Sequence, residues 1–362
     1  MKKFSIGILA LFVCLPLAAQ DTIRTYYDEQ QELLKEIYVR INGKAEGEVR
    51  RFSEDGKLVQ IGQLKNDQRH GLFIDLDPSN GDTIRIIPFL ENQRNGISKS
   101  YYSGGQIQQE LTFVDNQIQG KVTTYHPNGK VKDQTFFTND RPDGLSQSFH
   151  ENGQISRKVN YREGEFDGSM ETFDKNGNKL SSGTYKRGVL DGQELQYFSD
   201  GELKSSIEYS NGELNGNLLI YHPNRNKARV GTYKKGEADG EIMEYFEDGS
   251  LRSAITYKKG IPQGPLLIYH PNGKISLKRE FMEGTDIVSK ESYFYPNEQV
   301  FQILTYSAGI LEGEVKMYRE NGILQEIRHY KNGRLDGVRQ FFDEEGKLNR
   351  EEMYQMGKKI DK

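Results

Sequence analysis

A regular 24-residue spacing of glycines constrains the fold of this chain more than any other sequence feature. Short runs of alternating polar and apolar residues separate glycine-containing turns, and this pattern recurs to the end of the chain. In the unit from Gly240 to Gln263, one run ends at Tyr245, a turn follows, and a longer run ends at Tyr257 before a second turn. A fixed period of this length is the signature of a repeat protein, in which each unit packs only on its neighbours.

Thirteen units follow one another, and two of them contain one additional residue. We count positions from the first residue of each unit, which is position zero. The additional residues lie in the units that begin at Gly71 and Gly264. The units begin at Gly47, Gly71, Gly96, Gly120, Gly144, Gly168, Gly192, Gly216, Gly240, Gly264, Ser289, Gly313 and Gly337.

Three columns of apolar residues recur in these units. Position five is aromatic in every unit but one: Phe52, Leu76, Tyr101, Tyr125, Phe149, Phe173, Tyr197, Tyr221, Tyr245, Tyr269, Phe294, Tyr318 and Phe342. Position seventeen carries Phe113, Phe137, Tyr161, Tyr185, Tyr209, Tyr233, Tyr257, Phe281, Tyr306, Tyr330 and Tyr354. Position eleven is aliphatic, as at Leu203, Leu251 and Leu324. Because side chains alternate along a strand, these odd positions are expected to share one face.

The turns set the register of the predicted strands. A two-residue Asn-Gly turn after position five would place an aromatic residue opposite a mostly polar column. A three-residue loop that ends in glycine places Tyr245 opposite Leu251, and glycine accepts the left-handed conformation that this loop needs. The same loop at the second turn, as at Leu190-Asp191-Gly192, would place Tyr257 opposite Tyr269. Since a slip of one residue moves every side chain to the other face, we expect all three apolar columns on one face.

The predicted fold class is therefore all-β: an elongated, single-layer antiparallel β-meander of about thirteen 24-residue hairpin repeats over residues 47–362. An ordinary β-sandwich does not need this period, and a helical solenoid does not have glycine turns twice in each unit. Residues 21–46 are interpreted as a degenerate first repeat or an N-terminal cap. Within them, Asp28–Glu36 is compatible with one or two helical turns instead.

Residues 1–20 are predicted to be a secretory signal peptide, because Lys2 and Lys3 precede an apolar run that is too short to span a membrane. We accordingly expect a secreted protein, periplasmic or at the cell surface, with no transmembrane segment after cleavage. Cys14 is the only cysteine and lies inside this segment, so the mature chain would contain no disulfide, thiolate zinc site or thiol nucleophile. A lipoprotein anchored through Cys14 is the alternative interpretation.

The repeat pattern G-x₄-Y-x-x-N-G…Y-x-x-G-x-x-x-G resembles the MORN-repeat superfamily, specifically its bacterial variant. The resemblance covers about residues 47–357, with good matches at 120–143, 192–215, 240–263 and 313–336. It implies β-hairpins that stack into one long sheet. Bacterial members are often described as antitoxin-like, which implies a third hypothesis: an immunity or antitoxin-like protein that neutralises a toxin.

The polar residues of the repeats are the candidates for metal binding or catalysis. Equivalent histidines of adjacent units would lie two strands apart, about 9–10 Å, which is too far to share a metal. We therefore interpret the histidines at position six as turn residues: His126, His150, His222 and His270. The recurrent Asn-Gly pairs lack the pattern of a phosphate-binding loop, and the acidic turn at Asp343 lacks spaced calcium ligands. We expect no enzyme, no cofactor and no metal site.

The leading functional hypothesis is a non-catalytic protein-binding module or scaffold of the bacterial envelope. The alternative is binding of glycan or cell wall through the aromatic face. Nucleic acid is not expected as a partner, because the charge of the chain is mixed and its net value is −4. The candidate partner-binding face comprises Tyr185, Tyr197, Tyr209, Tyr221, Tyr233, Tyr245, Tyr257 and Tyr269.

Overall fold

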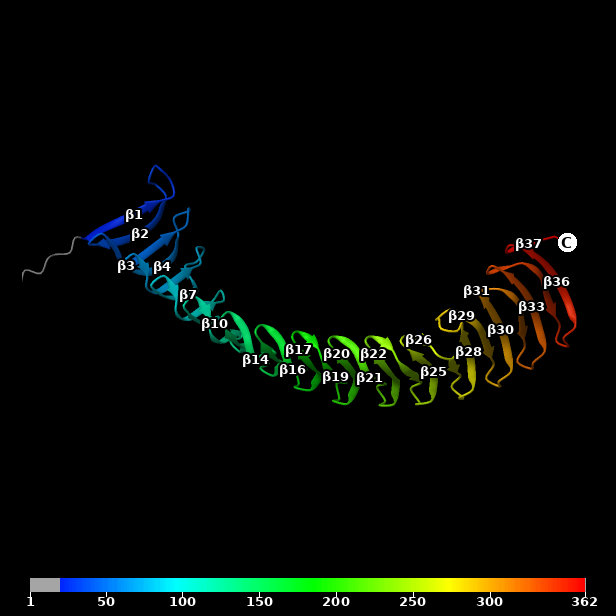
Figure 1. Cartoon of the computed structure of the whole chain (residues 1–362). Helices are drawn as coiled ribbons and strands as arrows, with labels where there is room; N and C mark the ends of the chain where they lie inside the picture. Colours follow the sequence, from blue (N-terminus) through cyan, green and yellow to red (C-terminus); the bar gives the residue numbers. More distant parts are fainter. Residues whose placement is uncertain (1–19, 362) are drawn as a thin grey trace, which may run out of the picture. The chain divides into compact units, whose positions relative to one another are not determined.

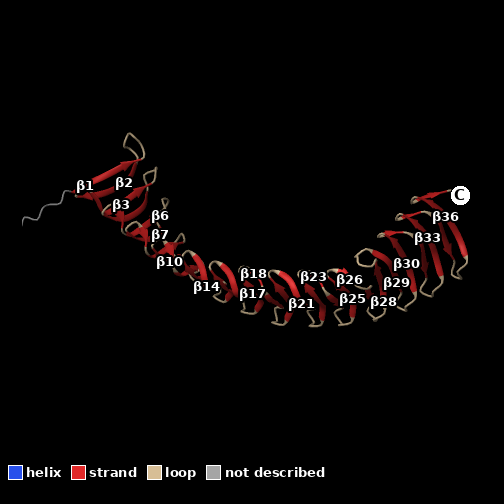
Figure 2. Cartoon of the chain, in the orientation of Figure 1, coloured by secondary structure: helices blue, strands red, loops and turns tan. Residues whose placement is uncertain are grey.

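The computed structural model of the chain describes residues 20–361. These residues form 37 β-strands and no helix (Figures 1 and 2). Strands that follow one another along the chain pair antiparallel within each repeat and with the next repeat. The prediction of an all-β antiparallel meander is confirmed. The predicted signal peptide, including Cys14, lies outside the described residues except for its last residue, Gln20.

The chain divides into two compact units, and one strand, β15 (Ile155–Arg162), contributes residues to both. Unit 1 extends to Ile155 and includes Tyr161–Gly164. Its other strands are β1 (Gln20–Tyr26), β2 (Leu34–Ile41), β3 (Lys44–Phe52), β4 (Leu58–Lys65), β5 (Gln68–Arg69), β6 (Gly71–Leu76), β7 (Thr83–Leu90), β8 (Gln93–Arg94), β9 (Gly96–Tyr101), β10 (Ile107–Val114), β11 (Gln117–Ile118), β12 (Gly120–Tyr125), β13 (Val131–Thr138) and β14 (Arg141–Phe149).

Unit 2 comprises Ser156–Asn160 and Glu165–Lys362. Its strands after β15 are β16 (Glu165–Phe173), β17 (Lys179–Lys186), β18 (Val189–Leu190), β19 (Gly192–Tyr197), β20 (Leu203–Ser210), β21 (Glu213–Tyr221), β22 (Lys227–Lys234), β23 (Glu237–Ala238), β24 (Gly240–Tyr245), β25 (Leu251–Lys258), β26 (Ile261–Pro262), β27 (Leu266–Tyr269), β28 (Ile275–Phe281), β29 (Val288–Phe294), β30 (Val300–Ser307), β31 (Ile310–Leu311), β32 (Gly313–Tyr318), β33 (Leu324–Lys331), β34 (Arg334–Leu335), β35 (Gly337–Phe342), β36 (Leu348–Gln355) and β37 (Lys358–Ile360).

The first turn of each repeat has the predicted geometry. Tyr245 pairs with Leu251, and the amide of Phe246 donates to the carbonyl of Ser250 at 2.9 Å, which leaves a three-residue loop. Gly249 closes this loop at a φ of 88°, a conformation that glycine adopts without a steric penalty. Arg252, which follows Leu251, has no partner residue in the ladder. It forms a β-bulge, which shifts the register of the hairpin.

The second turn differs from the prediction. It contains two residues, Lys259 and Gly260, both at positive φ (52° and 74°), so it is a type I′ turn, whose twist matches that of the flanking strands. Tyr257 consequently pairs with Pro262 on β26, and the predicted pairing of Tyr257 with Tyr269 is wrong. The segment predicted to be the second loop, Leu190-Asp191-Gly192, lies instead where two strands meet: Leu190 ends β18 and Gly192 begins β19.

The predicted single apolar face is therefore wrong as well. Positions zero, two, four, thirteen, fifteen and seventeen share one face, which we call the core face. In the repeat at β24 and β25 its pairs are Gly240 with Tyr257, Ile242 with Ile255 and Glu244 with Ser253. Tyr245 follows Glu244 along the strand and thus lies with its partner Leu251 on the other side, the opposite face. Two features separate the apolar columns that were predicted to share one face. They are the bulge between positions eleven and thirteen and the two-residue turn.

The most buried side chains lie at positions two and fifteen of the core face. At position two, Val49, Phe73 and Val315 are each only 1% exposed, and at position fifteen Val159 is 2% exposed. At Gly62, the absence of a side chain at position fifteen accommodates a large neighbour: a Cβ there would overlap the ring of Phe73. These two positions alternate across the strands and form the core of each repeat. Most residues of the predicted columns are half-buried, although Phe113 is buried and Leu348 is exposed.

Residues 21–46 form β1, β2 and the start of β3, which pair antiparallel with one another. Asp28–Glu36 is not helical. Instead the carboxylate of Asp28 accepts hydrogen bonds from the amides of Glu32 (3.0 Å) and Leu33 (2.6 Å), which closes the loop between β1 and β2. The segment thus continues the hairpin pattern without the 24-residue spacing.

Candidate binding surfaces

The eight tyrosines predicted as one binding face divide between two faces. Tyr185, Tyr209, Tyr233 and Tyr257 occupy position seventeen, on the core face, each opposite the first glycine of its repeat. Tyr197, Tyr221, Tyr245 and Tyr269 occupy position five, on the opposite face, each paired with the residue at position eleven. All eight side chains are half-buried. A single partner surface therefore contains at most four of them.

The side chains at position six connect consecutive repeats along one edge of the strands. His222 Nε2 lies 2.9 Å from the carbonyl of Tyr245, the residue at position five of the next repeat, and His126 and His270 make the equivalent contact at the same distance. A carbonyl only accepts hydrogen bonds, so each Nε2 carries the hydrogen. These three histidines are turn residues, as predicted, and they also hold adjacent repeats together.

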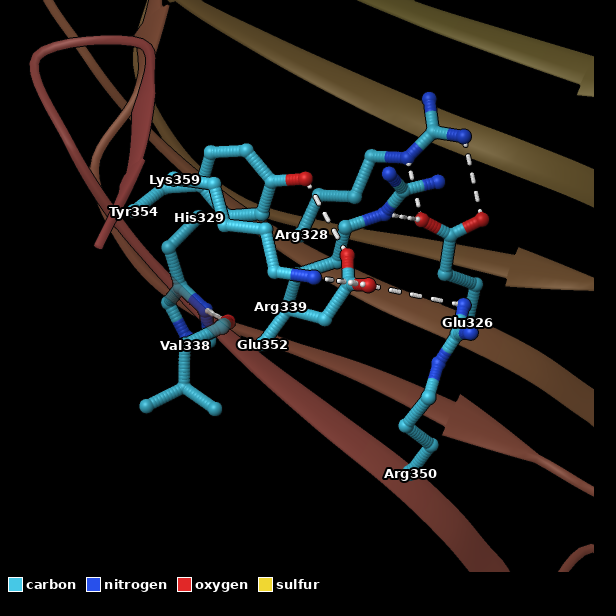
Figure 3. A network of polar contacts seen from close by, with 9 residues as sticks. All are labelled: Glu326, Arg328, His329, Val338, Arg339, Arg350, Glu352, Tyr354 and Lys359. Carbon is cyan, nitrogen blue, oxygen red and sulfur yellow. Dashed lines mark hydrogen bonds and ion pairs between the residues drawn. The ribbon is translucent and has the colours of Figure 1, made fainter. Parts of the chain in front are cut away.

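A network of charged side chains covers the core face of β33, β35 and β36 (Figure 3). Glu326 is 6% exposed and accepts hydrogen bonds from Arg328, through Nε (2.6 Å) and Nη2 (3.0 Å), and from Arg339 Nε. Phe341 pairs with Glu326 on one side and with Arg350 on the other. The guanidinium carbons of Arg339 and Arg350 lie 4.5 and 4.2 Å from the centre of the Phe341 ring. The arginines are thereby held in fixed orientations.

Burial alone would raise the pKa of Glu326, but the hydrogen bonds from Arg328 and Arg339 outweigh burial, and the pKa of its carboxyl lies below the ordinary value. Glu291 on β29 is in a similar setting. Burial opposes ionisation, while hydrogen bonds from Tyr306 and Arg279 lower the pKa of the Glu291 carboxyl. Burial and Glu291 together raise the pKa of Tyr306. Both carboxylates are therefore ionised and already bonded at neutral pH.

An apolar patch lies on the opposite face of unit 1, across β4, β6, β7 and β9. Ile61 pairs with Ile74 and Ile74 with Ile86, while Leu72 pairs with Pro88 in the neighbouring row. The six residues of the patch are Ile61, Leu72, Ile74, Ile86, Pro88 and Ile97. Leu72 and Ile97 are 52% and 53% exposed, so no described part of the chain covers these two side chains. Isolated apolar residues at a surface are ordinary, but a contiguous group marks an interaction site.

Sequence reasoning missed both the apolar patch and the charged network. The apolar patch had a signal in the sequence, because aliphatic residues occupy positions one and three of the repeat that begins at Gly71 and position fourteen of the repeat before it. The charged network had none, since Glu326 and Phe341 come together only through the observed register. Among residues 20–361, no group of three or more His, Cys, Asp or Glu side chains is arranged to hold a metal ion. The same residues contain no helix long and apolar enough to cross a membrane.

The MORN repeat variant family matches nine segments of the chain, which together make up more than half of it. Each matched segment begins two residues before the first glycine of a repeat. The segments are residues 45–66, 94–115, 118–139, 142–163, 166–187, 190–211, 238–259, 311–332 and 335–356. The unmatched repeats include the two that contain an additional residue, those beginning at Gly71 and Gly264.

Curated proteins show no significant similarity to the chain. Among solved structures, a TcdB2–TccC3 crystal structure aligns with 93% of this chain and 23% of its own, at 12% identity and a TM-score of 0.16. The Photorhabdus luminescens Tc holotoxin pore aligns with 91% of this chain and 21% of its own, at 12% identity and a TM-score of 0.17. The chain thus spans less than a quarter of the length of these proteins.

Proposed function

Because the chain belongs to the MORN repeat variant family, we propose that it is a non-catalytic, secreted binding protein or scaffold of the bacterial envelope, and that its partner is another protein. The proposal of secretion rests on the N-terminal sequence: Lys2 and Lys3 before an apolar run that ends in small residues. It predicts that the protein isolated from the periplasm or cell surface begins near Asp21, as measured by intact mass.

The apolar patch of unit 1 is the observation that supports a protein as the partner. The patch runs across four strands, and two of its side chains, Leu72 and Ile97, are more than half exposed. Arg50 and Lys99 flank the row of isoleucines, pairing with Ile61 and Ile86 respectively. An apolar centre with a charged rim is the arrangement of a protein–protein interface, in which a few central side chains supply most of the affinity.

Capture from periplasmic and surface fractions tests this proposal. The immobilised full chain should retain a specific partner, and the variant Leu72→Glu/Ile97→Glu should lose it, with affinity reduced at least about tenfold. The matched control is Ile310→Glu/Leu348→Glu, which changes two residues of unit 2 that are each 50% exposed. Circular dichroism establishes that both variants fold. The proposal fails if the wild-type chain captures no partner, or if both double variants lose it equally.

Glycan or cell-wall binding is the second candidate. The observation that favours it is the row of half-buried tyrosines on the core face of unit 2, Tyr185, Tyr209, Tyr233 and Tyr257, because exposed aromatic faces stack on sugar rings. This candidate predicts sedimentation of the chain with peptidoglycan or a signal on a glycan array, and loss of either with Tyr209→Ala. Absence of both signals for the wild-type chain would eliminate it.

A further inference from the structure

We infer that the core face of β33, β35 and β36 binds an acidic segment of a partner protein through its arginines. We call Arg328, Arg339 and Arg350, together with the Phe341 ring between them, the arginine cluster. This inference rests on the proposed function and names the chemistry of a second contact, separate from the apolar patch.

The charge of this surface is the first argument. Arg328, Arg339, Arg350 and Lys359 carry four positive charges, and Glu326 and Glu352 carry two negative charges, which leaves a local net charge of +2. The whole chain, in contrast, has a net charge of −4. A local excess of positive charge in an acidic protein attracts carboxylates and increases their rate of encounter.

The fixed orientation of the guanidinium groups is the second argument. Glu326 is buried and bonded to Arg328 and Arg339, so these arginines are held in place before any ligand arrives. Arg350 stacks on Phe341 at 4.2 Å and reaches Glu352 only at 3.7 Å, and its side chain is 61% exposed. A carboxylate can therefore approach Arg350 without breaking a strong ion pair. Preorganised arginines lose less side-chain entropy when they bind a carboxylate.

The small net positive charge of this surface favours a polypeptide as its ligand over a densely charged polymer. A net charge of +2 matches two or three carboxylates on a short segment. A nucleic acid or a highly sulfated glycan carries many more charges, and the acidic remainder of this chain would repel it. The surface also consists of adjacent strands, across which an extended acidic segment could contact Arg328, Arg339 and Arg350 in turn.

Fluorescence anisotropy with a labelled oligoglutamate peptide and the full chain at low ionic strength tests this inference. The wild-type chain should bind the peptide, and sodium chloride should weaken the binding. Arg350→Gln should weaken it about 1.5-fold to fivefold, the range for exposed ion pairs. Glu352→Gln raises the local charge to +3 and should strengthen binding. The matched control Arg252→Gln removes an exposed arginine of β25 and should leave the affinity unchanged.

No binding by the wild-type chain, or an equal loss with Arg252→Gln and Arg350→Gln, would overturn the inference. Tighter binding of sulfated dextran than of oligoglutamate, with the same dependence on Arg350, would assign the surface to an anionic glycan and overturn the choice of partner. The capture experiment with Leu72→Glu/Ile97→Glu distinguishes a failure of the present inference from a failure of the proposed function. If capture still depends on the apolar patch while oligoglutamate does not bind, only the present inference is wrong.

Discussion

At the residue scale, the glycines at position fifteen make room for the core side chains of the next repeat. Gly62 has no positive φ, so only the space around it restricts this position, and Phe73 fills that space. Gly62→Ala should therefore lower the free energy of unfolding by about 1–3 kcal/mol, the usual cost of overpacking a core. Urea denaturation measures the loss. The second substitution Phe73→Leu, in the Gly62→Ala background, should recover part of it, and a tolerated Gly62→Ala would contradict the assigned packing.

The histidines at position six allow a second residue-scale prediction. His222→Phe preserves an aromatic ring, which Phe198 and Phe246 show to be compatible with this position, but removes the hydrogen bond to the carbonyl of Tyr245. The free energy of unfolding should fall by about 0.5–1.5 kcal/mol, the net contribution of one hydrogen bond. His70→Phe is the control, because His70 lies outside this column. Equal stability of the wild-type chain and His222→Phe would show that the contact does not hold the repeats together.

At the element scale, the two-residue turn determines which strand residues meet. Lys259 has a φ of 52°, a backbone conformation that asparagine tolerates better than lysine. The equivalent turn of another repeat is Asn332-Gly333. Lys259→Asn should therefore stabilise the chain by about 0.5–1 kcal/mol in thermal or urea unfolding. Lys234→Asn, within β22, should give no gain. A destabilising Lys259→Asn would indicate that the turn lies elsewhere.

The pairing of β33 with β35 should depend on pH through Glu326. Its folded-state pKa is depressed, so the ionised carboxylate stabilises the fold above its ordinary pKa of 4.5. This contribution is lost as the pH falls from about that value through the lower folded-state pKa. The free energy of unfolding of Glu326→Gln should accordingly change less between pH 7 and pH 3 than that of the wild-type chain. Identical pH profiles would show that the hydrogen bonds from Arg328 and Arg339 contribute nothing to stability.

Much of the element-scale fold could be predicted from the sequence, because the glycine period and the alternation of side chains are local signals. The strands, the antiparallel meander and the pairing of Tyr245 with Leu251 were predicted correctly. The second turn was placed wrongly because the turn glycine and the first glycine of the next repeat lie close together: Gly236 closes the turn, whereas Gly240 begins β24. That error placed position seventeen on the wrong face. It also hid the core at positions two and fifteen, where polar residues such as Ser98 interrupt the apolar pattern.

The arrangement of the candidate binding residues was predicted less well, because it depends on contacts between strands. The sequence indicated a surface of eight tyrosines, and the structure distributes these between two faces. The apolar patch and the arginine cluster arise where single repeats depart from the common pattern. Such departures carry no period, and the register brings their side chains together: it places Leu72 beside Pro88 and Phe341 between Glu326 and Arg350.

At the scale of the whole molecule, the repeats provide two faces that can vary independently, since substitutions on one face leave the backbone pairing unchanged. Unit 1 carries exposed apolar side chains on its opposite face, and unit 2 carries ordered arginines on its core face. Stacked repeats with a constant backbone and variable side chains are suited to building extended binding surfaces. On the proposed function, the chain binds a protein partner through the opposite face of unit 1.

Site-specific photocrosslinking in the native cell is a direct test of this interaction. A photoreactive residue at position 97, within the apolar patch, is compared with one at position 109 on the core face of β10, where Gln109 pairs with Ser100 and Thr124. Binding through the apolar patch predicts a specific adduct with one partner protein from position 97 and none from position 109. An adduct from position 109 alone, or the absence of any adduct from position 97, would contradict it.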